Sequence, residues 1–153
     1  MNYDELRIET TFENGSLIPA KYTGYGENIS PEFKLENLSP NTKSLVIILE
    51  DLSHPIKNFT HWVAWNIGAN SIIPEDVGSR EDIIQGIAYG FHKYAGPKPP
   101  VAKKHNYQFT IYALDTILDL SPNHTKKRLL RAMSGHILQK GTIAGYFQKA
   151  RRL

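Results

Sequence analysis

The sequence of 153 residues contains no cysteine, which excludes disulfides and thiolate metal sites. It also lacks an apolar run of the roughly 18 residues that a membrane-spanning helix needs. Its longest such run is the short segment 45–49. Neither a basic leader nor an apolar stretch marks the N-terminus as a signal peptide. We therefore expect a soluble, cytoplasmic protein without integral membrane association.

A strong excess of charge of either sign is also missing. Lys and Arg number 18 against 15 Asp and Glu, a formal net charge of +3 with histidine neutral. Such a small positive net charge does not indicate nucleic-acid binding. The content of 41% hydrophobic and 22% charged residues is that of an ordinary folded protein. The length fits one domain spanning residues 1–153.

Three segments have the pattern of β-strands. Residues 45–49 are β-branched and apolar on both faces, which is typical of a central strand covered on both sides. Residues 61–67 predict a second strand, and residues 107–114 alternate as a third. The stretch 68–104 between the last two is irregular and rich in Gly and Pro, and loops this long are often functional.

The segment 125–139 differs, because its apolar residues recur at spacings of three and four. This pattern predicts an amphipathic helix with Thr125 as N-cap and Gly141 as the stop. Residues 142–147 would then return as a final strand. Several strands followed by one late helix favour a mainly β sandwich with helical decoration.

Polar residues stand at the ends of the apolar strand faces. Asp51 extends the face of 45, 47 and 49, while His105 and Tyr107 begin the face of 109 and 111. His61 begins a face that it shares with 63 and 65. If these ends meet, they form a pocket with apolar walls and a polar floor; otherwise each is an isolated strand-end residue.

The loop 94–100 reads Tyr-Ala-Gly-Pro-Lys-Pro-Pro. Its prolines make it stiff and extended, so it can form one wall of a pocket, act as a linker or bind a partner. Gly96 would allow a backbone N–H to approach an anion closely.

Taken in order, these residues resemble the phosphatidylethanolamine-binding protein family, which includes Raf kinase inhibitor protein, and most closely its short bacterial and archaeal branch. Residues 51–55 resemble the family's Asp-Pro-Asp-x-Pro motif, and His61-Trp62 its His-Trp strand. The remaining matches are Phe12, 18–23, 28–31, 43–45, 66–67, Gly86, Gly90, Tyr94, 96–97, 99–100, His105, Tyr107, 112–115, 132–133, 135–138 and 145–146.

The resemblance implies a sandwich of two antiparallel sheets with a C-terminal amphipathic helix and short helical decorations. It also implies a pocket for phosphate-like anions or phospholipid head groups. We expect no cofactor, and we find no convincing constellation of catalytic residues in the sequence. The pocket positions are Asp51, Pro55, His61, Gly96, Pro99, Pro100, His105 and Tyr107, and the peptide bond before Pro55 is expected to be cis. Short bacterial relatives imply a homodimer, and the kinase-inhibitor members imply a protein partner.

Three departures from the family pattern concern the ligand. Ser53 replaces the second Asp of the first motif, which removes a negative charge near Asp51. The segment between the double proline and His105 is shortened and carries Lys103 and Lys104. Ala88 replaces an Asn that is typical of the branch.

We expect the two histidines and Tyr107 to grip the anion, while Asp51 orients a histidine and favours its imidazolium form. Three alternatives use the same residues or surface. A serine hydrolase would need Asp51, Ser53 and a histidine as a triad, although Ser53 lacks the Gly-x-Ser-x-Gly context. A metal-dependent hydrolase would need His61, His105 and Asp51 as ligands. A kinase- or protease-inhibitor-like interaction protein would use its outer surface and rests on family analogy.

Overall fold

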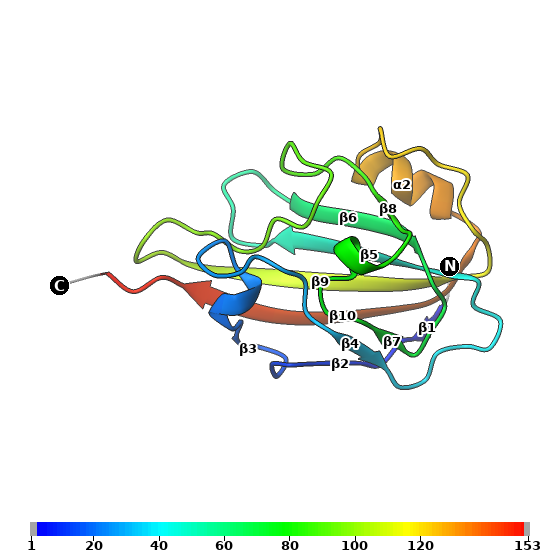
Figure 1. The fold of residues 1–153 in the computed structure, drawn as a ribbon, viewed down its shortest axis with the longest axis horizontal. Helices are drawn as coiled ribbons and strands as arrows, with labels where there is room; N and C mark the ends of the chain where they lie inside the picture. Colours follow the sequence, from blue (N-terminus) through cyan, green and yellow to red (C-terminus); the bar gives the residue numbers. More distant parts are fainter. Residues whose placement is uncertain (1–2, 152–153) are drawn as a thin grey trace.

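The computed structural model describes residues 3–151 and is built mainly of strands with a few short helices (Figure 1). In chain order the elements are β1 (Asp4–Glu5), β2 (Ile8–Thr10), β3 (Ser16–Leu17), the 3₁₀ helix η1 (Ala20–Tyr22), β4 (Phe33–Leu35), β5 (Ser44–Asp51), β6 (Phe59–Ile67), β7 (Ile72–Ile73), α1 (Val77–Arg80), β8 (Ile84–Gln85), β9 (Lys104–Leu114), α2 (Lys126–Met133) and β10 (Ile137–Gln148). Over the described range, every helix is too short or too polar to cross a bilayer. The prediction of a mainly β fold is confirmed.

The strands form two sheets. The larger has the order β1-β10-β9-β5-β6-β8 with β3 also on β10, and the smaller has the order β2-β4-β7. The long strands β5, β6, β9 and β10 pair antiparallel. The two-residue strands β1 and β3 instead run parallel to β10 along its outer edge. The larger sheet is therefore mixed, and the expectation of wholly antiparallel sheets is wrong at these two strands.

The larger sheet is covered on both faces, as the apolar run 45–49 predicts. Alternate residues of β5 enter two separate hydrophobic clusters, because side chains alternate between the faces of a strand. The cluster between the sheets contains Leu45, Ile47, Leu49, Phe33, Ile73, Phe109 and Ile111. The cluster under α2 contains Val46, Ile48, Val63, Trp65, Tyr112, Leu114, Leu129 and Met133. In Figure 1, α2 lies on one side of the larger sheet and the smaller sheet on the other.

The late helix is shorter than its sequence pattern predicts. It begins after Thr125 as expected, although the Thr125 side chain makes no capping hydrogen bond. It ends at Met133, and Gly135 then adopts a φ of +83° that a helix cannot continue. Ile137 opens β10 and pairs with Leu114 of β9. The predicted helix through Gln139 is therefore wrong at its C-terminal end, and the final strand is longer than 142–147.

Gly141 is not the helix stop that its sequence position suggests. It lies within β10, where a Cβ atom would come 2.1 Å from the carbonyl oxygen of Leu6. The absence of a side chain lets the N-terminal segment pass close to β10. The stretch 68–104 holds only the short elements β7, α1 and β8, in agreement with its predicted irregularity.

The attachment of α2 can be tested with two neighbouring leucines. Leu129 is fully buried in the cluster beneath the helix, whereas Leu130 is 40% exposed. Leu129→Ala should lower the free energy of unfolding by about 2–5 kcal/mol, because it removes buried methyl groups and leaves a cavity. Leu130→Ala, the matched control, should cost less than about 1 kcal/mol. Urea denaturation measures both values, and equal losses would contradict this packing.

Candidate functional site

The three central strands bring the predicted polar residues to one end of the larger sheet. Asp51 ends β5 and is the register partner of Tyr107 in β9. His105 precedes Tyr107 by two residues and shares its face of the strand. Asp51 is 3% exposed and Tyr107 1% exposed. The predicted convergence of strand ends is therefore present in the structure.

His61 reaches this group through an irregularity in β6. Leu49 pairs with Trp62, but the next residue of β5, Glu50, pairs with Thr60, so His61 is an extra residue in β6. Such a bulge re-aims a side chain toward the opposite face. Val63 enters the cluster under α2, whereas the His61 ring lies 5.6 Å from the Tyr107 ring. The prediction that His61 shares a face with 63 and 65 is wrong for this reason.

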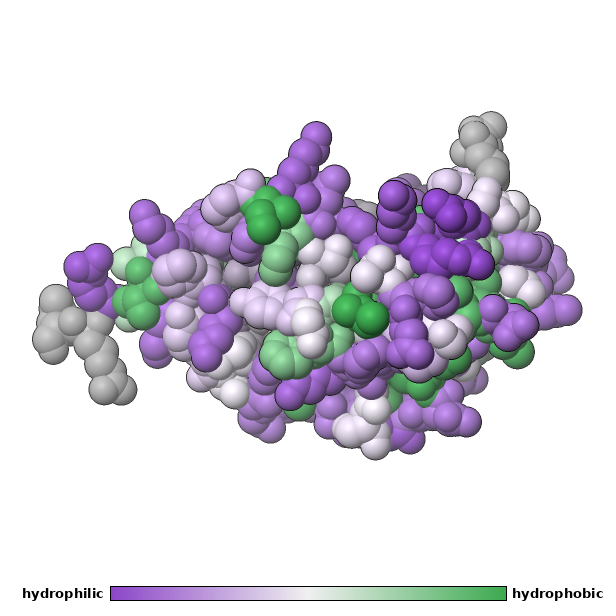
Figure 2. Space-filling model, turned by 90° about the horizontal axis from the view of Figure 1, so that it is seen from above, coloured by the Kyte–Doolittle hydropathy of each residue, from purple (hydrophilic) through white to green (hydrophobic). Residues whose placement is uncertain are grey.

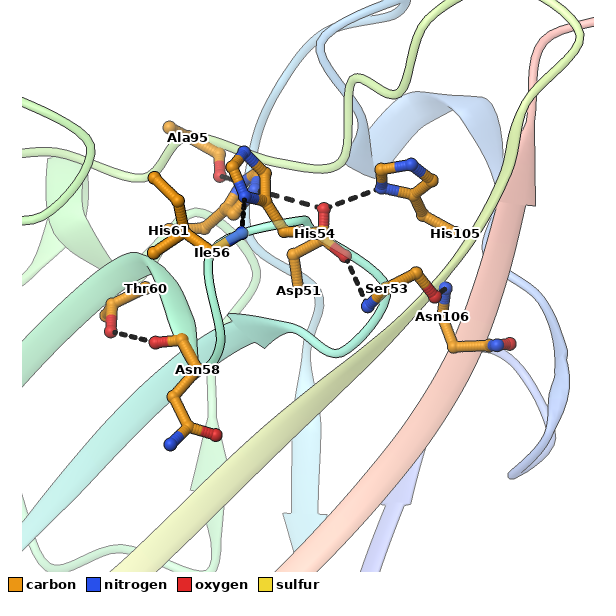
Figure 3. Close-up of polar contacts among 10 residues, drawn as sticks. All are labelled: Asp51, Ser53, His54, Ile56, Asn58, Thr60, His61, Ala95, His105 and Asn106. Carbon is orange, nitrogen blue, oxygen red and sulfur yellow. Dashed lines mark hydrogen bonds and ion pairs between the residues drawn. The ribbon is translucent and has the colours of Figure 1, made fainter.

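The Asp51 carboxylate organises the site (Figure 3). Its Oδ2 accepts a hydrogen bond of 2.7 Å from Nδ1–H of His105, and its Oδ1 accepts one of 2.8 Å from the backbone N–H of Ser53. Nε2 of His61 lies 4.0 Å from Oδ2. Since Nδ1 of His105 is committed to Asp51, Nε2 of His105 is left to meet a ligand.

His61 is held in one tautomer by the loop that precedes β9. Its Nδ1 lies 2.9 Å from the carbonyl oxygen of Ala95, which can only accept, so Nδ1 carries the hydrogen. Burial lowers the pKa of His61, and the negative charge of Asp51 only partly opposes this shift. Asp51 does favour the imidazolium form of His61, as expected, but desolvation is the larger effect and the net pKa is lowered. The neutral ring turns a lone pair on Nε2 toward the site.

Tyr107 contributes a hydroxyl with no partner. Among the described residues, this buried oxygen makes no hydrogen bond of normal geometry. Burial raises the pKa of Tyr107, and the nearby charge of Asp51 raises it further. The hydroxyl therefore keeps its proton, and a buried O–H without an acceptor is costly.

The stiff loop 94–100 forms a wall through its backbone. The hydroxyl of Tyr94 donates to the carbonyl of Tyr22 at 2.6 Å, and that of Tyr25 donates to Pro99 at 2.5 Å. The N–H of Gly96 donates to Oδ1 of Asn28 at 2.8 Å. Gly96 is therefore not the free anion donor that the sequence suggests.

Two of the predicted pocket residues do not belong to the buried cluster of Asp51, His61 and Tyr107. Pro55 and Pro100 are both exposed. The bond between His54 and Pro55 is trans, as is every peptide bond in the described part of the chain, so the expected cis peptide is wrong. The His54 ring instead stacks on Phe59 with centroids 4.0 Å apart.

Two aromatic residues that the sequence did not single out enclose His61. The ring of Tyr89 lies 4.8 Å from that of His61, and the ring of Phe59 lies 5.5 Å from it. Phe59 is a strand neighbour two positions before His61, a relation that the sequence does contain. Tyr89 comes from the long loop, where no periodic pattern identifies it.

The geometry of the site gives little support to the serine-hydrolase and metal-dependent hydrolase alternatives. The hydroxyl of Ser53 accepts a 2.8 Å hydrogen bond from the N–H of Asn106, and Ser53 meets Asp51 through its backbone. These contacts are not those of a nucleophile paired with a histidine base. Across residues 3–151, no three His, Cys, Asp or Glu side chains are arranged to hold a metal ion.

Comparison with known proteins gives a consistent result. The family model described as phosphatidylethanolamine-binding protein matches residues 8–148. A UPF0098 protein of Pyrococcus horikoshii is 43% identical over 94% of this chain and 77% of its own length. One of Archaeoglobus fulgidus is 45% identical over 95% of this chain, which spans only 52% of that relative.

Solved structures extend the comparison to three dimensions. A homologue from Chlamydia trachomatis, described as a phosphatidylethanolamine-binding protein homologue, has a TM-score of 0.85 and 34% identity, covering 95% of this chain and 99% of that one. YbcL of E. coli, described as a member of the mammalian family, shares the fold with a TM-score of 0.83 and 23% identity, over 94% and 98% of the two chains. The fold, the ordered site residues and these matches together show that the chain belongs to the phosphatidylethanolamine-binding protein family.

Proposed function

We propose that this protein binds a small phosphate-like anion, free or as the head group of a phospholipid, among Asp51, His61, His105 and Tyr107. The observation that carries the proposal is the buried Tyr107 hydroxyl, which has no acceptor. It lies beside the rings of His61, whose Nε2 is 4.0 Å from Asp51, and of His105, whose Nδ1 alone is committed to Asp51. A phosphoryl oxygen would supply the missing acceptor.

Each side chain has a distinct part in the proposed binding. Tyr107 donates its O–H to the anion, and His105 donates through Nε2 when its ring carries both protons. Asp51 accepts the Nδ1–H of His105 and so holds the ring in place, with Nε2 left for the anion. Because both carboxylate oxygens of Asp51 already accept hydrogen bonds, their repulsion of an incoming anion is reduced. Hydrogen bonds to charged groups are the strong ones, so few are needed.

Replacing Tyr107 by Phe tests the carrying observation. The substitution removes one oxygen and keeps the ring, so binding of sulfate or phosphate should weaken roughly ten- to hundredfold, the loss of one charge-assisted hydrogen bond. The free energy of unfolding should stay equal or rise, because a buried unsatisfied hydroxyl disappears. Isothermal titration and urea denaturation measure the two effects.

Tyr112→Phe is the matched control, since Tyr112 is also largely buried but lies in the cluster under α2. It should leave anion binding unchanged. If Tyr107→Phe binds as the wild type does, or if the wild type binds neither anion at millimolar concentration, the proposal is wrong.

The lowered pKa of His61 predicts a pH dependence. Neutral His61 offers a lone pair to the site, whereas the protonated ring offers Nε2–H, so an anion binds the protonated form better. Binding should therefore raise the pKa of His61, and affinity should increase as pH falls from about 7.5 to about 5. Sulfate is the suitable probe, because it stays a dianion in this range.

NMR titration of the His61 ring, with and without sulfate, measures this coupling. His136 is exposed and pairs with Asp115 away from the site, so its titration should not respond to sulfate. An unchanged His61 pKa in the presence of saturating sulfate would show that His61 does not donate to the anion.

A further inference from the structure

Two histidines among residues 3–151 have Nδ1 on an aspartate carboxylate. Nδ1 of His105 lies 2.7 Å from Oδ2 of Asp51. Nδ1 of His136 lies 2.9 Å from Oδ1 of Asp115. Because an ionised carboxylate only accepts hydrogen bonds, a ring with a single proton carries it on Nδ1 in both pairs. The lone pair of each ring is then on Nε2, where the imidazole can act as a nucleophile.

The two pairs differ in their exposure to water. The side chains of His136 and Asp115 are 47% and 45% exposed. His136 lies three residues beyond the end of α2, and the surface over this helix is strongly hydrophilic in Figure 2, which looks down on it. The side chains of His105 and Asp51 are only 15% and 3% exposed. Charges interact more strongly in the buried pair, because less water screens them.

This difference matters if Nε2 attacks a phosphorus atom. The ring then becomes cationic, because Nδ1 keeps its proton while Nε2 gains a bond. At His105 the positive charge forms beside the buried carboxylate of Asp51, which stabilises it. The Tyr107 hydroxyl, which has no partner in the described part of the chain, can donate to an oxygen of the phosphoryl group. The ring centres of Tyr107 and His105 lie 6.2 Å apart, so one phosphoryl group can meet both side chains.

His61 is a poorer acceptor than His105, although its Nε2 also turns a lone pair toward the site. Its Nδ1–H donates to the carbonyl of Ala95, which carries no negative charge. A cationic His61 ring would therefore lack a carboxylate hydrogen bond, and burial disfavours the cation further. The geometry selects His105 as the nucleophile.

The same side chains restrict the phosphoryl donor through its leaving group. The alkoxide that leaves from a phosphate ester needs a proton from the site. His61 does not supply it, because burial lowers its pKa and the neutral ring has no proton on Nε2. Tyr107 is a weak acid here, because burial raises its pKa. A carboxylate leaves without a proton, so an acyl phosphate suits the site.

We propose that Nε2 of His105 accepts a phosphoryl group from an acyl phosphate and becomes a phosphohistidine. The lone pair of Nε2 forms the new N–P bond. The bond between phosphorus and the acyl oxygen breaks, and the carboxylate leaves with its electron pair. The Nδ1 proton stays between the ring and Asp51, so the step needs no further reactant. The inference rests on the proposed function, since the phosphoryl group occupies the place of the bound anion.

The test is incubation of the full chain with acetyl phosphate at about pH 8, where an imidazole is mostly neutral. Phosphorus-31 NMR and peptide mass spectrometry should find a phosphoryl group on His105, in a form that acid removes and base preserves. His105→Gln should abolish this label. Sulfate at high concentration should slow the labelling of the wild type, because it occupies the same site.

Asp51→Asn tests the role of the carboxylate. The amide keeps the shape of the carboxylate but has no charge, so labelling at saturating acetyl phosphate should slow about tenfold or more. Saturation removes any effect of the substitution on donor affinity, so the rate reports the transfer step. Asp115→Asn, the matched control, removes the same charge from the exposed pair and should leave the rate at His105 unchanged. If both variants react as the wild type does, the proposal is wrong.

His136 is an internal control that requires no substitution. It offers the same Nε2 in water, so equal labelling of His105 and His136 would show an unselective reaction and overturn the proposal. Sulfate binding without labelling of His105 also overturns it, and leaves the proposed function standing. Labelling of His105 in a protein that binds neither sulfate nor phosphate supports the transfer and overturns the reversible binding of anions.

Discussion

The buried carboxylate of Asp51 is the constraint on which the rest of the site depends. A carboxylate that is almost fully removed from water is stable only if hydrogen bonds replace its hydration. Here one oxygen accepts a hydrogen bond from the N–H of Ser53, and the other accepts one from Nδ1–H of His105. These bonds tie the loop after β5 to the start of β9. The same bonds fix which nitrogen of His105 remains for a ligand.

The four long strands of the larger sheet could be predicted because their hydrophobic patterns are simple. Residues 45–49 are apolar at every position, and this predicted a strand with two covered faces. The end of α2 could not be predicted in the same way. Ile137 follows Met133 at helical spacing, yet it also alternates within β10, and only the positive φ of Gly135 decides between the two. The role of Gly141 depends on its contact with Leu6, which is distant in the sequence.

The clustering of Asp51, His61, His105 and Tyr107 was predicted more reliably than the orientations of their side chains. Asp51 and Tyr107 follow strict alternation along regular strands, so their faces were predictable. His61 is itself the extra residue of a bulge in β6, and such a residue departs from the alternation of the strand that follows it. Three other features depend on loop conformations. Asn28 accepts the N–H of Gly96, the peptide bond before Pro55 is trans, and the ring of Tyr89 lies beside that of His61. No periodic pattern encodes these.

The proposed function accounts for a tyrosine at position 107 that folding alone does not explain. Within the folded protein alone, a phenylalanine would fill the same volume without burying an unpaired oxygen, so stability does not account for the tyrosine. A neutral, buried His61 is also costly to protonate, as its lowered pKa shows. Both costs are offset if an anion occupies the site and supplies the missing acceptor and the opposite charge. The loops 52–60 and 86–104 beside the site contain five lysines and no acidic residue, so their charges attract an anion and do not add to the negative charge of Asp51.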